Sequence, residues 1–115
     1  TADLGRAILL DSVRVESPVL TPNGDGVNDE TTVLATIYQL AGAQRIHIGV
    51  HDLSGRRLRD LSIERDQPSG EHHVPWDGRD DDGRVVPPGT YLVVVELTTD
   101  GRGRLRRVVP VAVVY

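Results

Sequence analysis

Turn-forming residues divide the chain into short segments of strand character, and this spacing constrains the fold more than any other feature. Glycine, asparagine, aspartate and proline recur between segments in which β-branched and polar residues alternate. No stretch has the apolar spacing of a long amphipathic helix. Strands are expected in about seven segments, namely residues 7–16, 31–40, 45–53, 56–63, 71–76, 90–99 and 104–115. The pattern predicts an all-β fold in which antiparallel strands form a two-layered sandwich.

Two of these segments are expected to be irregular. In residues 56–63 the apolar side chains of Leu58, Leu61 and Ile63 do not share one parity, which predicts a bulge or a twist. In the last segment Pro110 has no amide hydrogen to donate, so this strand is expected at a sheet edge or at a bulge.

Length and composition exclude several classes of protein. The 115 residues suit one domain, placed at residues 11–115, with residues 1–10 as an N-terminal linker or an extra strand. The absence of cysteine excludes a disulfide framework. A net charge of −4 argues against nucleic acid as a partner, and the short apolar runs argue against direct membrane insertion. Because the chain opens at Thr1 without a targeting segment, it is interpreted as a mature or excised piece.

Five sequence blocks resemble one bacterial domain family. They are residues 21–30 (TPNGDGVNDE), 50–56 (VHDLSGR), 69–72 (SGEH), 76–83 (WDGRDDDG) and 87–92 (PPGTYL). In this order they are similar to the immunoglobulin-like (Ig-like) domain named after the C-terminal domain of the flagellar hook-capping protein. They also resemble the C-terminal domains of gliding-motility-associated surface proteins. The resemblance implies an Ig- or fibronectin-III-like antiparallel sandwich without a catalytic role, while the flagellar role does not transfer, because one fold serves many functions.

The first of these blocks is a candidate calcium loop. It contains the chain's only two asparagines, Asn23 and Asn28. The block is similar to the calcium loops of thrombospondin type 3 repeats and dockerins. In that register Asn23, Asp25 and Asp29 offer side-chain oxygens and Val27 offers its carbonyl oxygen, the ligand type that calcium prefers.

The same loop departs from the calcium pattern at two positions. Thr21 stands where an aspartate is expected, and Thr32 stands where a bidentate acid would close the ligand shell. The alternative is a structural loop in which Asn23 and Asp25 bond backbone amides. Calcium is the only cofactor that the sequence suggests, and both interpretations stay open.

The acidic segment at residues 77–82 also has two interpretations. It could form a second cation site or an acidic docking surface. Alternatively, Asp77 and Asp80 cap consecutive turns while Asp81 and Asp82 face water.

Catalytic and zinc sites are not expected. His47 and His51 share a strand face but lie about 13 Å apart, too far for one zinc ion, and His72 and His73 point to opposite faces. There is no Gly-x-Ser-x-Gly elbow. Trp76 is interpreted as a core or rim residue rather than as a carbohydrate platform, because no second aromatic residue stands near it in the sequence.

Two hypotheses for the function follow, and neither is an enzyme. The first is a non-catalytic Ig-like spacing, anchoring or assembly module of a secreted or cell-surface bacterial protein, with neighbouring domains or identical subunits as partners. The second is a self-assembling subunit of an extracellular filament, in which residues 7–10 or the last strand pair with another copy by β-augmentation. The arginines of the last strand, at positions 102, 104, 106 and 107, either block such pairing or dock acidic loops of a neighbour.

Overall fold

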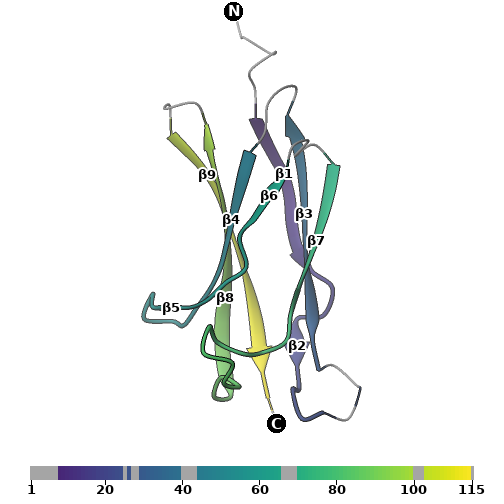
Figure 1. The fold of residues 1–115 in the computed structure, drawn as a ribbon, viewed down its shortest axis with the longest axis vertical. Coiled ribbons are helices and arrows are strands. Elements are labelled where there is room, and N and C mark those ends of the chain that lie inside the picture. The colour runs from purple at the N-terminus through teal and green to yellow at the C-terminus, as the bar shows by residue number, and fades with distance from the viewer. Residues whose placement is uncertain are drawn as a thin grey trace, which may run out of the picture.

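Two β-sheets pack face to face in the computed structural model, which describes residues 8–24, 26, 29–39, 44–65, 70–99 and 103–114 (Figure 1). Their strands are, in chain order, β1 (Ile8–Val15), β2 (Val19–Leu20), β3 (Thr31–Gln39), β4 (Gln44–His51), β5 (Arg57–Asp60), β6 (Ile63–Arg65), β7 (Gly70–Trp76), β8 (Gly89–Thr99) and β9 (Gly103–Val113). One sheet has the order β1-β3-β7. The other has the order β2-β9-β8-β4-β5, with β6 paired to β4. Every pairing is antiparallel except that of β2 with β9.

The predicted antiparallel sandwich is confirmed, with differences of detail. A strand lies in each of the seven expected segments, and the described residues add the two-residue strand β2. The irregular segment 56–63 is divided between β5 and β6, and the β4–β5 register shifts between Val50 and His51. Between the two short strands, the hydroxyl of Ser62 accepts the amide hydrogen of Ile48 at 3.1 Å, in place of a ladder bond.

The chain passes from one sheet to the other between β1 and β2. There the side chain of Thr31 accepts the amide hydrogen of Ser17 at 3.0 Å and donates its own to the Ser17 carbonyl at 2.7 Å. Thr31 is 2% exposed, so these bonds satisfy a polar group that would otherwise be buried without a partner. The crossing frees β2 to pair with β9 at the far edge.

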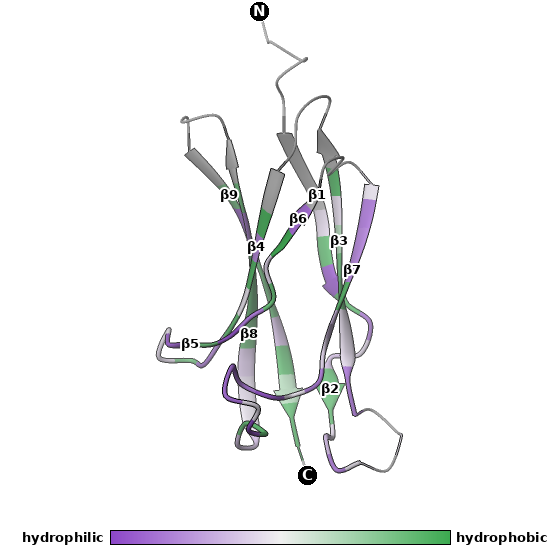
Figure 2. Ribbon diagram, in the orientation of Figure 1, coloured by the Kyte–Doolittle hydropathy of each residue, from purple (hydrophilic) through white to green (hydrophobic). Residues whose placement is uncertain are grey.

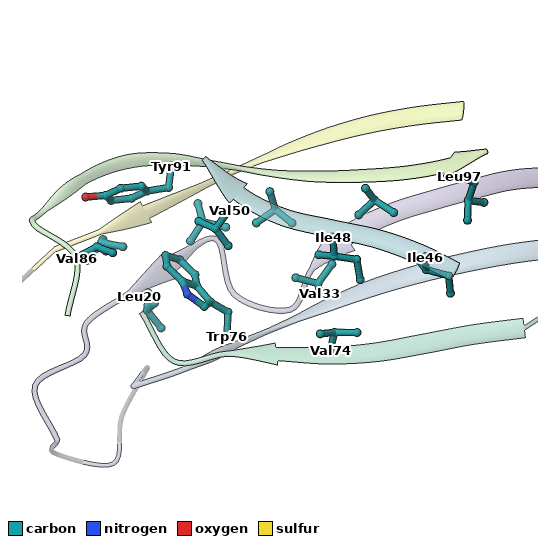
Figure 3. Close-up of a cluster of buried hydrophobic side chains, with 14 of the residues drawn as sticks. Leu20, Val33, Ile46, Ile48, Val50, Val74, Trp76, Val86, Tyr91 and Leu97 are labelled. Atoms are coloured by element: carbon teal, nitrogen blue, oxygen red, sulfur yellow. The ribbon is translucent and has the colours of Figure 1, made fainter. Parts of the chain in front are cut away.

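The core lies between the sheets because every long strand directs alternate side chains, most of them apolar, toward the other sheet (Figure 3). The three-stranded sheet contributes Val33, Ile37, Val74 and Trp76. The six-stranded sheet contributes Leu20, Ile46, Ile48, Val50, Tyr91, Val93, Val95, Leu97, Val111 and Val113. Two parallel layers of aliphatic side chains with aromatic rings at one end form a dry interior.

The outer edge of β9 is paired only near its C-terminal end, as far as the described strands show. The amides of Ala112 and Val114 donate to the carbonyls of Pro18 and Leu20 at 2.8 and 2.9 Å. Backbone N–H and C=O groups point to alternate sides along a strand, so those of the even-numbered residues of β9 point to this outer edge. Pro110 is an even-numbered residue, and its missing amide hydrogen therefore costs no bond to β8. This agrees with the expectation that Pro110 lies at a sheet edge or at a bulge.

None of the described residues forms a helix long and apolar enough to cross a membrane.

Candidate functional site at the loop end of the sandwich

The loop of residues 21–30 is organised by Asp29. Its two carboxylate oxygens accept the amide hydrogens of Gly24 at 2.9 Å and Gly26 at 2.6 Å. Both glycines have positive φ, near 81° and 83°, which turns their amides toward one point. The amide of Asn23 donates to the Thr21 carbonyl at 2.8 Å.

Among the candidate calcium ligands, only Asn23 and Asp29 can be placed. Asp25 and Val27 lie outside the described residues, as does Asn28. Sequence reasoning assigned the amide-bonding role to Asn23 and Asp25 and missed Asp29 as the acceptor. The signal was present, because two glycines with one residue between them precede a carboxylate within reach of both amides. In the part of the chain that the structure describes, no group of three or more histidine or acidic side chains is arranged to hold a metal ion.

The acidic segment 77–82 forms two capped turns. The Asp77 carboxylate accepts the Arg79 amide at 3.1 Å, and Asp80 accepts the amides of Asp82 at 2.9 Å and Arg84 at 3.0 Å. The prediction that Asp77 and Asp80 cap consecutive turns is therefore confirmed. These carboxylates do structural work, and their acceptor positions are partly occupied by the chain's own amides.

Asp81 and Asp82 are exposed, as expected. Asp81 also makes a contact that the sequence did not predict: its carboxylate accepts the Asp60 amide at 3.0 Å and its own amide donates to the Leu58 carbonyl at 2.9 Å. Arg59 reinforces the contact by donating to the Asp80 carbonyl at 3.1 Å. The acidic turns are thereby fastened to the edge strand β5. Sequence patterns gave no sign of this contact because it joins residues 21 positions apart.

Trp76 and Tyr91 close the sandwich beside these turns. Trp76 is 1% exposed and donates its indole N–H to the Arg79 carbonyl at 2.9 Å, which confirms the core position and contradicts a carbohydrate-stacking role. The two rings meet edge to face with centroids 6.1 Å apart. The Tyr91 hydroxyl donates to the Pro87 carbonyl, four residues upstream. A tyrosine at the start of this strand with such a bond is typical of Ig-like sandwiches.

The histidines form no shared site among the described residues. His47 and His51 lie on the outer face of β4, on either side of Gly49. His72 is buried and His73 is exposed, so the prediction of opposite faces is confirmed. His73 lies 2.8 Å from Glu71, an exposed pair.

The turn between β4 and β5 is held by Asp52. One carboxylate oxygen accepts the Ser54 amide at 3.0 Å, the Ser54 hydroxyl at 2.6 Å and the Arg56 amide at 3.0 Å. The hydroxyl of Ser54 first, and then the amide of Arg56, lower the pKa of Asp52 below its ordinary value. This residue lies at a hairpin turn, so the shift reflects a structural cap rather than an acid–base catalyst.

The fold and the turns together define the class of protein, an Ig-like β-sandwich. The blocks at residues 76–83 and 87–92 form its turns and cover one end of its core. The sequence profile of the FlgD Ig-like domain family matches residues 24–101, and the chain belongs to that family. No curated protein matches the chain.

Two solved structures share the fold. Dimeric latent PorU from Porphyromonas gingivalis superposes with a TM-score of 0.72 and 17% identity, over 94% of this chain and 9% of that chain. The β-glucuronidase of Parabacteroides merdae superposes with a TM-score of 0.58 and 15% identity, over 92% of this chain and 13% of that chain. At these identities the likeness shows the fold alone, and the chain spans only about a tenth of the length of either neighbour.

Proposed function

We propose that the chain is a non-catalytic structural module of a secreted or cell-surface bacterial protein, where it separates or anchors neighbouring domains or identical subunits. Membership of the FlgD Ig-like family supports this proposal, as does the occurrence of the fold as a small part of long chains. The sequence blocks that identify the family are engaged in turns, caps and core packing.

One observation supports such a role: the strands that carry its two ends are placed to resist tension. The start of β1 and the end of β9 lie at opposite ends of the long axis (Figure 1). β1 pairs antiparallel with β3, and after the crossing β2 runs parallel to β9 near the C-terminal end. Pulling the two ends apart therefore loads the β1–β3 ladder and then slides β2 along β9, so that the bonds from Ala112 and Val114 are strained together rather than one after another.

A matched pair of proline substitutions tests this role. Ala112→Pro removes the amide that donates to Pro18, whereas Val108→Pro makes the same backbone change where no described strand pairs with that edge. In single-molecule stretching of tandem copies, we expect Ala112→Pro to lower the unfolding force clearly and Val108→Pro to lower it much less. Equal forces for the two variants would contradict the tension-transmitting role.

A calcium-stiffened loop at residues 21–30 is a finer part of the proposal. Asp29 already accepts two amide hydrogens, so a calcium ion would use its remaining lone pairs together with oxygens of Asn23, Asp25 and Val27. Calcium is expected to raise the melting temperature of the native chain, and Asp25→Ala is expected to abolish the rise. A melting temperature indifferent to calcium would leave the loop as a structural turn held by Asp29.

The alternative of a filament built by β-augmentation has weaker support. The edge of β9 before Ala112 has no partner among the described strands, which leaves backbone groups open to another strand. However, Pro110 removes one donor from this edge, and the exposed side chains of Arg106 and Arg107 lie along the same strand. These are features by which proteins prevent edge pairing, and they favour the spacing module.

A further inference from the structure

The outer face of the six-stranded sheet is apolar where β8 and β9 lie side by side. We define the β8–β9 face by the outward-pointing apolar side chains of these strands, Leu92, Val94, Val108, Pro110 and Ala112. Val19 and Val114 extend it along β2 and the end of β9, and hydrophobic residues colour this half of β9 in Figure 2. Within the described residues, three of the four large hydrophobic side chains left exposed lie here: Val19 (41%), Val108 (44%) and Val114 (44%).

The outer face of the other sheet is polar by comparison. Its central apolar residue, Leu34, lies between Arg14 and His73 in the strand register. Glu71 forms an ion pair with Arg14 at 3.7 Å and a hydrogen bond with His73 at 2.8 Å. Polar and charged side chains thus lie over the three-stranded sheet. On the β8–β9 face, by contrast, Val108 and Pro110 are exposed, Leu92 and Ala112 are half-buried, and Val94 beneath them is 5% exposed. Contiguous exposed apolar patches of this kind mark interaction sites.

The β8–β9 face also carries one ion pair, whose position is informative. Glu96 of β8 and Arg106 of β9 are register partners joined at 3.5 Å, and Val94 and Val108 form the next pair on the same face. The two partners in each of these pairs share no backbone hydrogen bond, because the backbone N–H and C=O groups of even-numbered residues of β9 point away from β8. Side chains of such pairs lie especially close. Acidic and basic groups therefore stand at the same height on adjacent strands.

We propose that the β8–β9 face binds a second copy of the chain about a two-fold axis that runs parallel to the strands, between β8 and β9. Such an axis places each β9 side chain of one copy over its β8 register partner in the other. Val108 then meets Val94, and Arg106 meets Glu96, twice each. The apolar pairs stack and the four charges alternate in sign, so the face is complementary to itself.

The size of the face sets the strength of this dimer. Three strands about 4.8 Å apart and seven residues of β9, each rising about 3.3 Å, give the apolar region a footprint of roughly 300 Å² per copy. Together the two copies bury on the order of 600 Å², which is the size of a weak, transient contact. The dimer is therefore expected to dissociate at hundreds of micromolar, and to form readily where a surface or a long chain holds copies close together.

The solution mass across protein concentration tests the proposal. Light scattering and sedimentation velocity on the full chain from about 5 to 500 µM should show a monomer passing into a dimer. Val108→Asp should weaken the dimer by about ten-fold or more, because it buries an unpaired carboxylate among apolar groups. The control is Leu53→Asp, which replaces a side chain that is 69% exposed in the β4–β5 turn. It should leave the dissociation constant unchanged.

Charge reversal tests the axis itself. Glu96→Arg or Arg106→Glu alone should weaken the dimer, since each places like charges opposite one another, and the double reversal should restore it. Both positions are solvent-accessible, and a melting curve of each variant checks that the fold is intact. A wild-type monomer at all concentrations would overturn the proposal. A dimer indifferent to Val108→Asp, or a double reversal that fails to recover binding, would overturn it equally, the first result indicating strand-edge pairing instead.

Discussion

At the scale of single residues, Gly78 is a position where both the backbone conformation and the surrounding space favour glycine. Its φ is 76°, and a Cβ placed there would lie 3.0 Å from Leu20 Cδ2 and 3.2 Å from Pro22. The turn that follows Trp76 therefore packs against Leu20 and Pro22 at a distance that leaves no room for a side chain at position 78. Gly83 has the similar φ of 82° but has open space around it, which makes it a matched reference.

Gly78→Ala should destabilise the chain more than Gly83→Ala. Both substitutions put alanine in the left-handed region at a cost of about 1 kcal/mol. Gly78→Ala also overpacks the contact with Leu20 and Pro22, which adds about 1–3 kcal/mol. Urea denaturation of the two variants measures the difference directly. Equal losses would show that the loop yields without cost and that the contact does not hold the two segments together.

Residue patterns predicted the turns well and the side-chain partners poorly. The capping roles of Asp77 and Asp80 could be predicted because each carboxylate bonds an amide a few residues ahead. The bond from Asp81 to β5 could not, because it depends on where a distant strand lies. In the candidate calcium loop, the structure shows Asp29 as an acceptor, since two positive-φ glycines direct their amides to it, whereas Asp25 lies outside the described residues.

At the scale of elements, the β4–β5 hairpin shows how one turn depends on one carboxylate. Asp52 accepts three hydrogen bonds within the turn, and they lower its pKa in the folded chain. A group with a depressed folded-state pKa contributes stability above its unfolded pKa. This contribution is lost as the pH falls through the folded-state pKa, so the turn weakens in acid.

Ser54→Ala should raise the pKa of Asp52, because it removes the hydroxyl that contributes most to the shift. The carboxyl carbon resonance of Asp52, followed by NMR from about pH 2 to 6, measures both values. The acid-side loss of stability should be smaller in the variant and should be complete at a higher pH. An unchanged titration would mean that the Ser54 hydroxyl does not hold the carboxylate in solution.

Strand boundaries followed from alternation, but the break in segment 56–63 was only partly predictable. Mixed parity of Leu58, Leu61 and Ile63 indicated an irregularity without giving its form. The structure divides the segment because β5 and β6 pair with different parts of β4, and Ser62 supplies a side-chain acceptor in the gap. Strand β2 escaped prediction because two residues are too few to show a period.

At the scale of the whole molecule, the chain is a sandwich with two unlike outer faces and with its described ends far apart. The polar face over β1, β3 and β7 suits solvent, while the β8–β9 face suits a second copy. The extended shape, with extents of 52 × 28 × 21 Å, and the parallel pairing of β2 with β9 suit a module that separates and holds its neighbours. The spacing of strand segments predicted the sandwich. Whether an outer face is polar or apolar depends on which strands lie side by side and in what register, and the spacing does not show this.

The most direct test of this account is the force–extension curve of tandem copies of the wild-type chain. If the chain is a self-contained module that transmits tension, each copy should resist until β2 and β9 separate. It should then release in one step of roughly 300 Å, since an extended residue spans at most about 3.3–3.6 Å. A gradual extension at low force, or release in several small steps, would contradict the account, because the pairing of β1 with β3 and of β2 with β9 would then not hold the sandwich together.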